Sequence, residues 1–389
     1  DGLMTIFFLL VGLEIKRELL VGELSSFRKA ALPFIAACGG MLFPVIVYMS
    51  ICPPGSAGSQ GLAIPMATDI AFSLGVLSLL GSRVPLSLKI FLTAFAVVDD
   101  IGGILVIALF YSSHVSYGYI LIAALLYVLL YFIGKRGATN KIFFLVIGVV
   151  IWYLFLQSGI HSTISGVILA FVIPAKPRLD VGKYIEHIRH TIAGFPVVES
   201  GSIVLTNEQI AKLKEVESAS DRVISPLQSL EDNLHGAVNY LILPLFAFVN
   251  AGVVFSGGGE LVGSVGMAVA AGLLFGKFAG IYFFTWLAIK IKLTPMPPGM
   301  TWKNLSGIAL LGGIGFTVSL FIANLSFGAN YPVLLNQAKF GVLSGTILSG
   351  LLGYIVLSIT CPKAEIITRD QSFRHIGYSS GDMPFLLYI

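Results

Sequence analysis

Long apolar runs recur along the chain and set its predicted architecture. Most of them approach the roughly twenty residues that a helix needs to cross the hydrocarbon core of a bilayer. A membrane-spanning β-barrel would instead show short segments in which apolar and polar residues alternate. The pattern therefore predicts an all-α polytopic membrane protein. Its candidate segments are 3–13, 30–51, 61–80, 88–110, 117–133, 142–157, 161–174, 237–255, 262–289, 305–326 and 334–360. Of these eleven, 161–174 is short for a span, so a re-entrant helix is an alternative there.

Basic residues between these segments obey the positive-inside rule. Alternate connections hold 22 of the 24 Lys and Arg residues: 14–29, 81–89, 134–141, 175–236, 290–303 and the tail after 361. The intervening connections hold none: 52–60, 111–116, 158–160, 256–261 and 327–333. The basic connections and the C-terminus are therefore expected to be cytoplasmic. Eleven spans would then place residue 1 outside, which indicates at least one upstream helix and a parent protein of about twelve spans.

The same boundaries predict how the chain is organised. Membrane helices occupy 1–174 and 237–362, a cytoplasmic loop occupies 175–236, and a cytoplasmic tail occupies 363–389. The loop mixes acidic and basic residues, and the stretch around 181–192 has the pattern of an amphipathic helix. A solvated connector is the simplest interpretation of this loop.

Composition supports a membrane protein and excludes some other classes. Hydrophobic residues make up 56% of the chain and charged residues only 11%, whereas soluble domains carry about 25% charged residues. The net charge of +4 comes from basic residues scattered among the connections, so no nucleic-acid partner is expected. The three cysteines form neither a disulfide framework nor a metal-binding spacing.

Four ionisable residues lie well inside apolar runs: Asp69, Asp99, Asp100 and Lys277. Each costs about 2.5–3.5 kcal/mol at the centre of a membrane helix, or roughly 10 kcal/mol for the four. Structural pairing or snorkelling is the alternative to a functional role. That alternative fits a residue near the end of a run, such as Lys339, better than it fits the adjacent pair in FAVVDDIGGILV.

Asp99 and Asp100 have the chemistry of an exchange site. Adjacent residues on a helix point about 100° apart, and two close carboxylates repel each other, which favours a bound proton on one of them. When they are ionised, the same oxygens suit a hard cation. One site would thus hold either a proton or a metal ion. Lys277 is the natural partner for one of the aspartates and is itself able to carry a proton.

Two of the predicted helices are interrupted. Segment 61–80 contains Pro65 followed by Thr68 and Asp69, and segment 305–326 contains several glycines near its middle. These helices are the central members of two triplets, 30–110 and 262–360 overall, which the connection charges orient in opposite directions. Paired interruptions in opposed halves point to the binding site of a transporter. Simple kinks with glycine packing are the alternative for either helix alone.

Several motifs together resemble the bacterial sodium/proton antiporter family NhaA. The motifs are GLMTIFFLLVGLEIKREL, IPMATDIAFSLGVLSLLG, FLTAFAVVDDIGGILVIALFY, SGIHSTISGVILAF, YLILPLFAFVNAGV, GLLFGKFAGI and GGIGFTVSLFIA. The resemblance runs from residue 2 to about 360, interrupted near 179–228. It implies a twelve-helix exchanger of the bacterial inner membrane, with the first helix absent here and two interrupted helices crossing at mid-membrane.

The resemblance also implies residue roles. Asp99 and Asp100 would form the cation and proton site and would hold Na⁺. Thr68 and Asp69 would lie where the broken helices cross, with Lys277 balancing charge and pairing with Asp99. A cytoplasmic cluster linked to pH sensing would comprise Glu14, Arg17, Glu18, Glu231 and His235. The enlarged 179–228 loop departs from shorter family members, and the tail after 363 has no counterpart in the family.

The expected function is antiport of cytoplasmic Na⁺, together with Li⁺, against external H⁺ in a pH-dependent manner, for sodium extrusion and pH homeostasis. The alternatives are a cation channel and a proton-coupled carrier of a small organic solute. A channel would build its filter from symmetric rings, which are not visible here. An enzyme is not expected, because no nucleophile–base constellation occurs. No cofactor is expected. The partners are the two ions and the lipid bilayer, and a homodimer is an open possibility.

Overall fold

The computed structural model describes residues 2–111, 115–138, 140–176, 181–195, 206–253, 262–328 and 330–361. Within these ranges the regular elements are helices, and none of these residues forms a strand. The α-helices are α1 Gly2–Val21, α2 Phe27–Ile51, α3 Ile70–Ser78, α4 Leu86–Phe110, α5 Tyr117–Lys135, α6 Lys141–Ser158, α7 Thr163–Val172, α8 Val181–Ala193, α9 Asn207–Val223, α10 Pro226–Ala237, α11 Leu243–Asn250, α12 Ser264–Ala271, α13 Lys277–Lys290, α14 Trp302–Leu311, α15 Phe316–Phe327 and α16 Pro332–Thr360.

Six helices of the described chain are long and apolar enough to cross a membrane, counting Ser264–Lys290 as one continuous helix. The number rises to eight if two bent pairs, Ala57–Met66 with α3 and α14 with α15, each count as one span. The predicted all-α polytopic membrane protein is thus confirmed. The other three predicted segments correspond to α1, α7 and the stretch formed by the π-turn η5 (Val238–Ile242) and α11. The criterion does not select these three, so the total of eleven stays a prediction.

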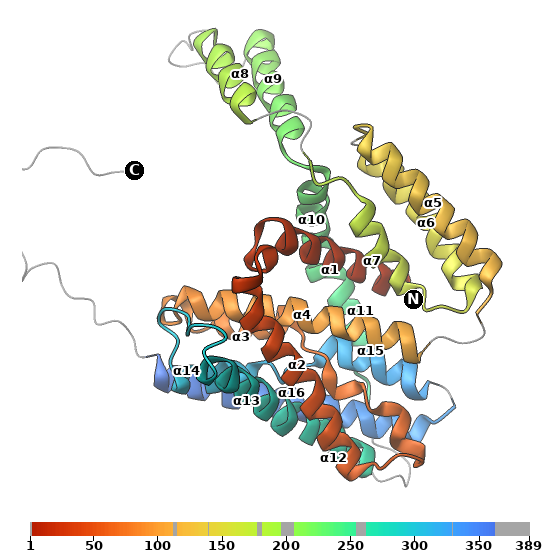
Figure 1. Ribbon diagram of the computed structural model, residues 1–389. Coiled ribbons are helices and arrows are strands. Elements are labelled where there is room, and N and C mark those ends of the chain that lie inside the picture. The colour runs from red at the N-terminus through yellow and green to blue at the C-terminus, as the bar shows by residue number, and fades with distance from the viewer. Residues whose placement is uncertain are drawn as a thin grey trace, which may run out of the picture.

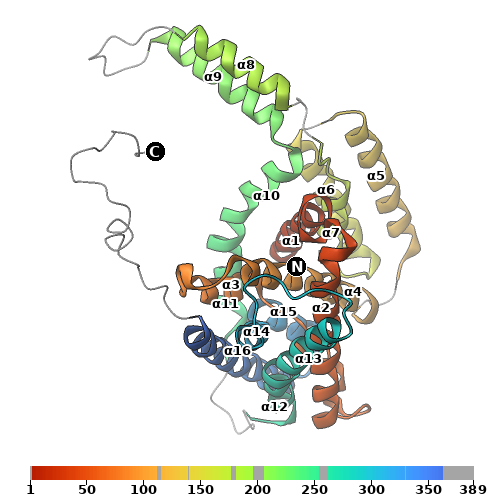
Figure 2. The ribbon, with the colours of Figure 1, turned by 60° about the vertical axis from the view of Figure 1, so that its left-hand side comes forward.

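Two groups of helices make up the molecule (Figure 1). In one group, α2 packs against α4 and α13, and α16 packs against α12, α14 and α15. In the other, α1 lies along α7, which also contacts the hairpin of α5 and α6. Contacts of α1 with α4 and of α11 with α15 join the two groups. Helices α8 and α9 pair with each other and project away from both groups, as Figures 1 and 2 show.

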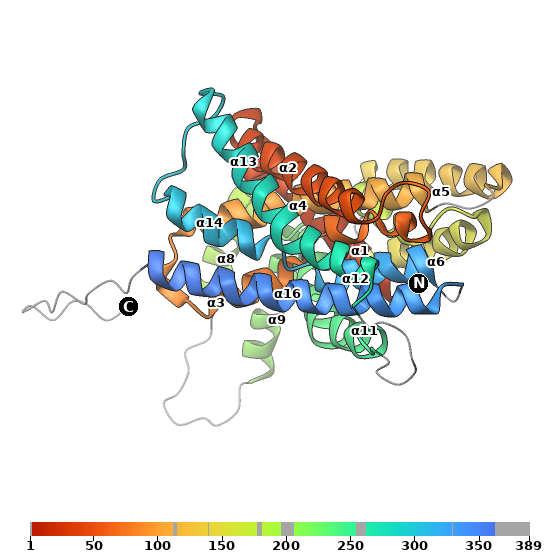
Figure 3. The ribbon, with the colours of Figure 1, turned by 90° about the horizontal axis from the view of Figure 1, so that it is seen from below.

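Glycines allow α2 and α13 to run side by side (Figure 3). A Cβ atom added at Gly280 would lie 2.1 Å from the carbonyl oxygen of Gly39, and one added at Gly276 would lie 2.6 Å from the Cα of Pro44. These distances are shorter than van der Waals contact, so only glycine permits this approach. The close packing fixes where Lys277, the residue after Gly276, enters the bundle.

The structure differs from the predicted boundaries in two places. Helix α1 continues to Val21, whereas the predicted segment ended at 13. The hydropathy falls after 13, but Glu, Lys, Arg and Leu all favour a helix, so the backbone hydrogen bonding continues. The 175–236 region holds α8, α9 and α10 rather than a plain connector, and the amphipathic helix predicted around 181–192 is α8. The predicted tail, 363–389, lies outside the described residues.

Candidate functional site

The two bent pairs meet at their breaks. The chain bends by 46° between Ala57–Met66, which ends in the short 3₁₀ turn η3 (Ile64–Met66), and α3, and by 44° between α14 and α15. The backbone N–H of Asp69 donates to the carbonyl oxygen of Ile314 at 2.6 Å, and the hydroxyl of Ser73 donates to that of Leu311 at 3.0 Å. Each break therefore supplies hydrogen-bond partners for backbone groups that the other break leaves unpaired.

Asp69 holds the beginnings of two helices at once. It is the N-cap residue of α3, where its Oδ1 accepts a hydrogen bond from the backbone N–H of Phe72 at 3.2 Å. Its Oδ2 accepts from the backbone N–H of Thr317, in the first turn of α15, at 3.0 Å and also from the Thr317 hydroxyl. A carboxylate is favourable at the positive end of a helix dipole, and here one carboxylate lies at two such ends.

Lys277 is the first residue of α13 and is fully buried. Its Nζ donates to Asp99 Oδ2 at 2.6 Å and to the hydroxyl of Thr68 at 2.9 Å. The Thr68 hydroxyl in turn donates to the carbonyl oxygen of Gly312, the C-cap residue of α14, at 2.8 Å. The Thr68 hydroxyl thus links the ammonium group to the C-terminus of α14, which is the negative end of its helix dipole. The ammonium group also lies 5.6 Å from the ring centroid of Phe95, within the range of a cation–π interaction.

Asp99 and Asp100 are both buried on α4, with exposed fractions of 1% and 6%. The Oδ2 of Asp99 accepts a hydrogen bond from Lys277, whereas its Oδ1 has no hydrogen-bond partner among the described residues. No described residue forms a hydrogen bond or ion pair with the Asp100 carboxylate either. Buried polar groups are almost always paired, and Asp99 Oδ1 departs from that rule. Carboxylate oxygens without a hydrogen-bond donor have the chemistry to accept either a proton or a hard cation.

A turn of π-helix, η6 (Gly272–Gly276), comes directly before Lys277. Such turns are uncommon and are frequently found at functional sites. A Cβ added at Gly272 would lie 2.7 Å from the Cβ of Pro65, so the turn packs directly against the first break. The sequence gives no signal for the π-turn, although the GLLFG spacing before the buried lysine indicates close packing. Thr317 was also missed, and its place two residues after Gly315 is the only hint of its role.

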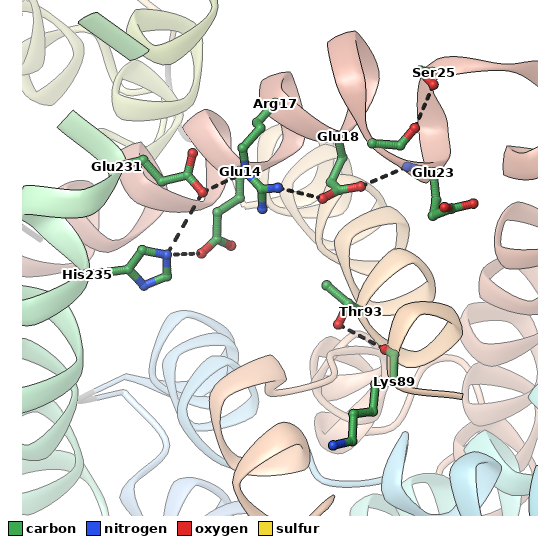
Figure 4. Close-up of polar contacts among 10 residues, drawn as sticks. Glu14, Arg17, Glu18, Glu23, Ser25, Lys89, Thr93, Glu231 and His235 are labelled. Carbon is green, nitrogen blue, oxygen red and sulfur yellow. Dashed lines mark hydrogen bonds and ion pairs between the residues drawn. The ribbon is translucent and has the colours of Figure 1, made fainter. Parts of the chain in front are cut away.

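The five residues of the expected cytoplasmic cluster come together on α1 and α10 (Figure 4). Arg17 Nε lies 2.8 Å from Glu231 Oε1, and Arg17 Nη1 lies 3.1 Å from Glu18 Oε1. His235 Nε2 lies 3.3 Å from Glu14 Oε1 and 4.0 Å from Glu231 Oε1. The continuation of α1 beyond 13 places Glu14 and Arg17 one turn apart, where they contact α10, and Glu18 next to Arg17.

This cluster has the composition of a titrating network rather than of a resident metal site. One ligand atom each from Glu14, Glu231 and His235 lie within 4.8 Å of one another, which a metal ion would require. However, the guanidinium of Arg17 already supplies a positive charge to Glu231. Burial, together with the nearby Glu231 carboxylate, raises the pKa of Glu14 to about 7, so a proton at Glu14 can alter the charge balance here.

Comparison with known proteins places the chain among antiporters. Residues 1–357 match the sequence family described as Na+/H+ antiporter 1. A protein named Na(+)/H(+) antiporter NhaA from Bacteroides thetaiotaomicron is 99% identical over 362 residues, which cover 93% of this chain and 82% of that protein. Proteins of the same name are 82% identical in Bacteroides fragilis and 64% identical in Phocaeicola vulgatus, each covering 93% of this chain and 83% or 81% of the relative. The chain therefore belongs to the Na+/H+ antiporter 1 family.

Proposed function

We propose that this protein exchanges Na⁺ for H⁺ at the Asp99–Asp100 pair. As a member of its family it is a multi-pass membrane protein and a secondary transporter rather than an enzyme. The observation that carries the assignment of the site is the unpaired, buried Oδ1 of Asp99 beside Asp100, a second buried carboxylate to which no described residue donates a hydrogen bond. Na⁺ is a hard cation that takes oxygen ligands, so it competes with protons for the same atoms.

Lys277 takes part in this competition from the other side of Asp99. Its ammonium group donates a hydrogen bond to Asp99 Oδ2 at 2.6 Å. A cation bound between the aspartates competes for the charge of Asp99 and so weakens this ion pair. A lysine deprived of its partner in a buried site readily loses its proton. We infer that Na⁺ entry releases a proton from Asp100, Lys277 or both, and that proton return restores the ion pair.

Alternating access is assigned to the two broken helices. Their mutual hydrogen bonds at Asp69 and Thr68 support a crossing at mid-membrane, with 30–110 and 262–360 as inverted halves. Movement of one half relative to the other would expose Asp99 and Asp100 to either side in turn. The positive-inside rule places the basic connections and the C-terminus in the cytoplasm of a bacterium. Proton entry from outside would then drive Na⁺, or Li⁺, out of the cell.

The Glu14–His235 cluster is proposed to set the pH dependence. Burial raises the pKa of Glu14 to about 7, so acid protonates Glu14 and changes its ion pair with His235 between α1 and α10. Helix α1 also contacts α4, the helix of the aspartates. His235→Gln and Glu231→Gln should each shift the pH at which exchange is half-maximal while preserving the maximal rate. An unchanged pH profile in both variants would remove this role.

The decisive experiment measures Na⁺-driven pH change in proteoliposomes across pH. Asp99→Asn and Asp100→Asn should each abolish exchange, whereas Glu208→Gln, an exposed carboxylate on α9, should leave it intact. Size-exclusion profiles would show whether the variants remain folded. Na⁺ flux without countermovement of protons would instead indicate a channel. Wild-type rates in both aspartate variants would show that the site lies elsewhere.

A further inference from the structure

A cavity of about 340 Å³ lies where three of the basic connections meet. It is bounded by the start of α2, the start of α4 and the segment 294–298 that follows α13. Figure 3 shows the end of α13 beside the start of α2. All three connections belong to the set that the positive-inside rule places in the cytoplasm, so the cavity opens at the inner surface of the membrane.

The mouth of the cavity is basic. Arg28 and Lys29 both line it and are exposed to solvent. Lys29 lies 3.7 Å from Glu23, which also lines the cavity, whereas no described residue pairs with Arg28. One positive charge is therefore left over at this mouth, and an anion placed there would meet two basic side chains and one acidic one.

Two helix N-termini border the same cavity. Helix α2 begins at Phe27, and its N-cap residue Ser26 makes no side-chain hydrogen bond to the first turn. Helix α4 begins at Leu86 after Pro85, which has no side chain able to cap it. The first N–H groups of a helix remain free for a ligand unless they are capped, and they favour a phosphate.

Thr294 provides an independent sign of a missing ligand. It lines the cavity and is only 4% exposed, yet its hydroxyl has no hydrogen-bond partner within the described part of the chain. A neighbouring hydroxyl is satisfied, because Ser87 donates to the carbonyl oxygen of Pro298. An unpaired buried hydroxyl is unfavourable by about 1–3 kcal/mol, and a ligand oxygen would remove that penalty.

The remaining walls show what kind of anion fits. They are apolar, with Leu32, Pro33, Ile90 and Phe91 lining the cavity. Just outside it, Phe27 and Leu86 expose 85% and 70% of their surface, as is usual for side chains that face lipid. A free inorganic anion would leave these surfaces uncovered, whereas a lipid would cover them with its acyl chains.

We propose that this cavity binds the headgroup of an anionic glycerophospholipid from the cytoplasmic leaflet. The phosphate lies near Arg28, Lys29 and the Thr294 hydroxyl, and the acyl chains follow the outer faces of α2 and α4. Basic pockets between membrane helices on the cytoplasmic side recognise anionic headgroups in this way. The bound lipid would join the start of α2 to the connection between α13 and α14.

Binding of phosphatidylglycerol to the purified full chain in neutral detergent tests the proposal. Each basic residue near a membrane surface contributes about 1 kcal/mol, or about fivefold in affinity, so R28Q/K29Q should weaken binding about 25-fold. T294V, which keeps the shape of the side chain, should weaken it about tenfold. The matched control is K135Q/R136Q, which removes two exposed charges from another basic connection and should bind as the parent does.

Four results would overturn the proposal. Unchanged binding in R28Q/K29Q would show that the lipid binds elsewhere, and an equal loss in K135Q/R136Q would show that binding reflects only overall charge. Phosphatidylcholine binding as tightly as phosphatidylglycerol would remove the role of the anion. Displacement of the lipid by millimolar inorganic phosphate would assign the cavity to a free anion. Exchange in liposomes of phosphatidylcholine should be the same in R28Q/K29Q and the parent.

Discussion

Replacing Lys277 with methionine removes a buried charge while it keeps a long, flexible side chain. In the parent structure Lys277 Nζ lies 2.6 Å from Asp99 Oδ2, and both side chains have no exposed surface. Removing one partner of a buried ion pair leaves the other charge uncompensated, which costs about 3–5 kcal/mol. With an unfolding entropy of about 2.1 cal/mol/K per residue, a chain of 389 residues should lose about 4–6 °C in melting temperature.

Asp99 provides the matching half of a double-mutant cycle. D99N alone leaves the ammonium group of Lys277 buried and unpaired, so it should destabilise the protein by a similar amount. K277M/D99N removes both charges, and replacement of a whole buried pair is often nearly neutral. The double variant should therefore melt within about 1–2 °C of the parent, which gives a coupling free energy of about 3 kcal/mol or more. It should nevertheless remain inactive, because a ligand of the cation has been lost.

Thermal unfolding in detergent, followed by fluorescence, provides the measurement. K303M, which removes an exposed lysine at the start of α14, is the control and should leave the melting temperature unchanged. The loss in K277M should shrink as the pH is lowered, because a proton then neutralises Asp99 in place of the lysine. Additive losses in the double variant, or a K277M protein as stable as the parent at neutral pH, would refute the ion pair as a stabilising contact.

Three other predictions follow from the same geometry. Lowering the pH should raise the apparent KM for Na⁺ by about tenfold per pH unit for each competing proton, and a fall in maximal rate alone, in proteoliposome assays, would exclude direct competition. Deleting 181–223 should preserve basal exchange, since α8 and α9 pack mainly on each other and the buried start of α10 is retained; loss of exchange in a correctly inserted protein would contradict this. Gly280→Ala should destabilise the protein by about 1–3 kcal/mol, because the added methyl group meets the Gly39 carbonyl. Gly75→Ala, where nothing lies within 4 Å of the added methyl group, should not, and equal melting temperatures of the two variants would count against this packing.

The buried charges and the helix breaks could be predicted because each carries a strong local signal. A charge such as Asp99 within an apolar run is unfavourable enough to need an explanation, and Pro65 or a group of glycines disrupts helical hydrogen bonding wherever it occurs. These signals do not depend on the rest of the fold. These local signals therefore identify residues that the structure brings together at the two bends.

The partners of those residues could not be predicted in the same way. Asp69 contacts Thr317 across 248 positions of sequence, and nothing near either residue encodes the other. The N-cap role of Asp69 at α3 is local, but its second role at α15 depends on how the two breaks meet. The length of α1 was also missed, because hydropathy measures lipid exposure, whereas a helix ends only where its backbone hydrogen bonding ends.

Asp69 and Asp100 show how one buried environment supports two kinds of carboxylate. Both are nearly inaccessible to solvent, so burial alone cannot distinguish them. Asp69 accepts hydrogen bonds from Phe72 and Thr317 and ties two helices together, so releasing it would break both helix starts. Asp100 has no such bonds within the described chain, so exchanging one bound ion for another disrupts no structure. The distribution of hydrogen-bond donors therefore decides which acid holds the fold and which is free to bind a transported ion.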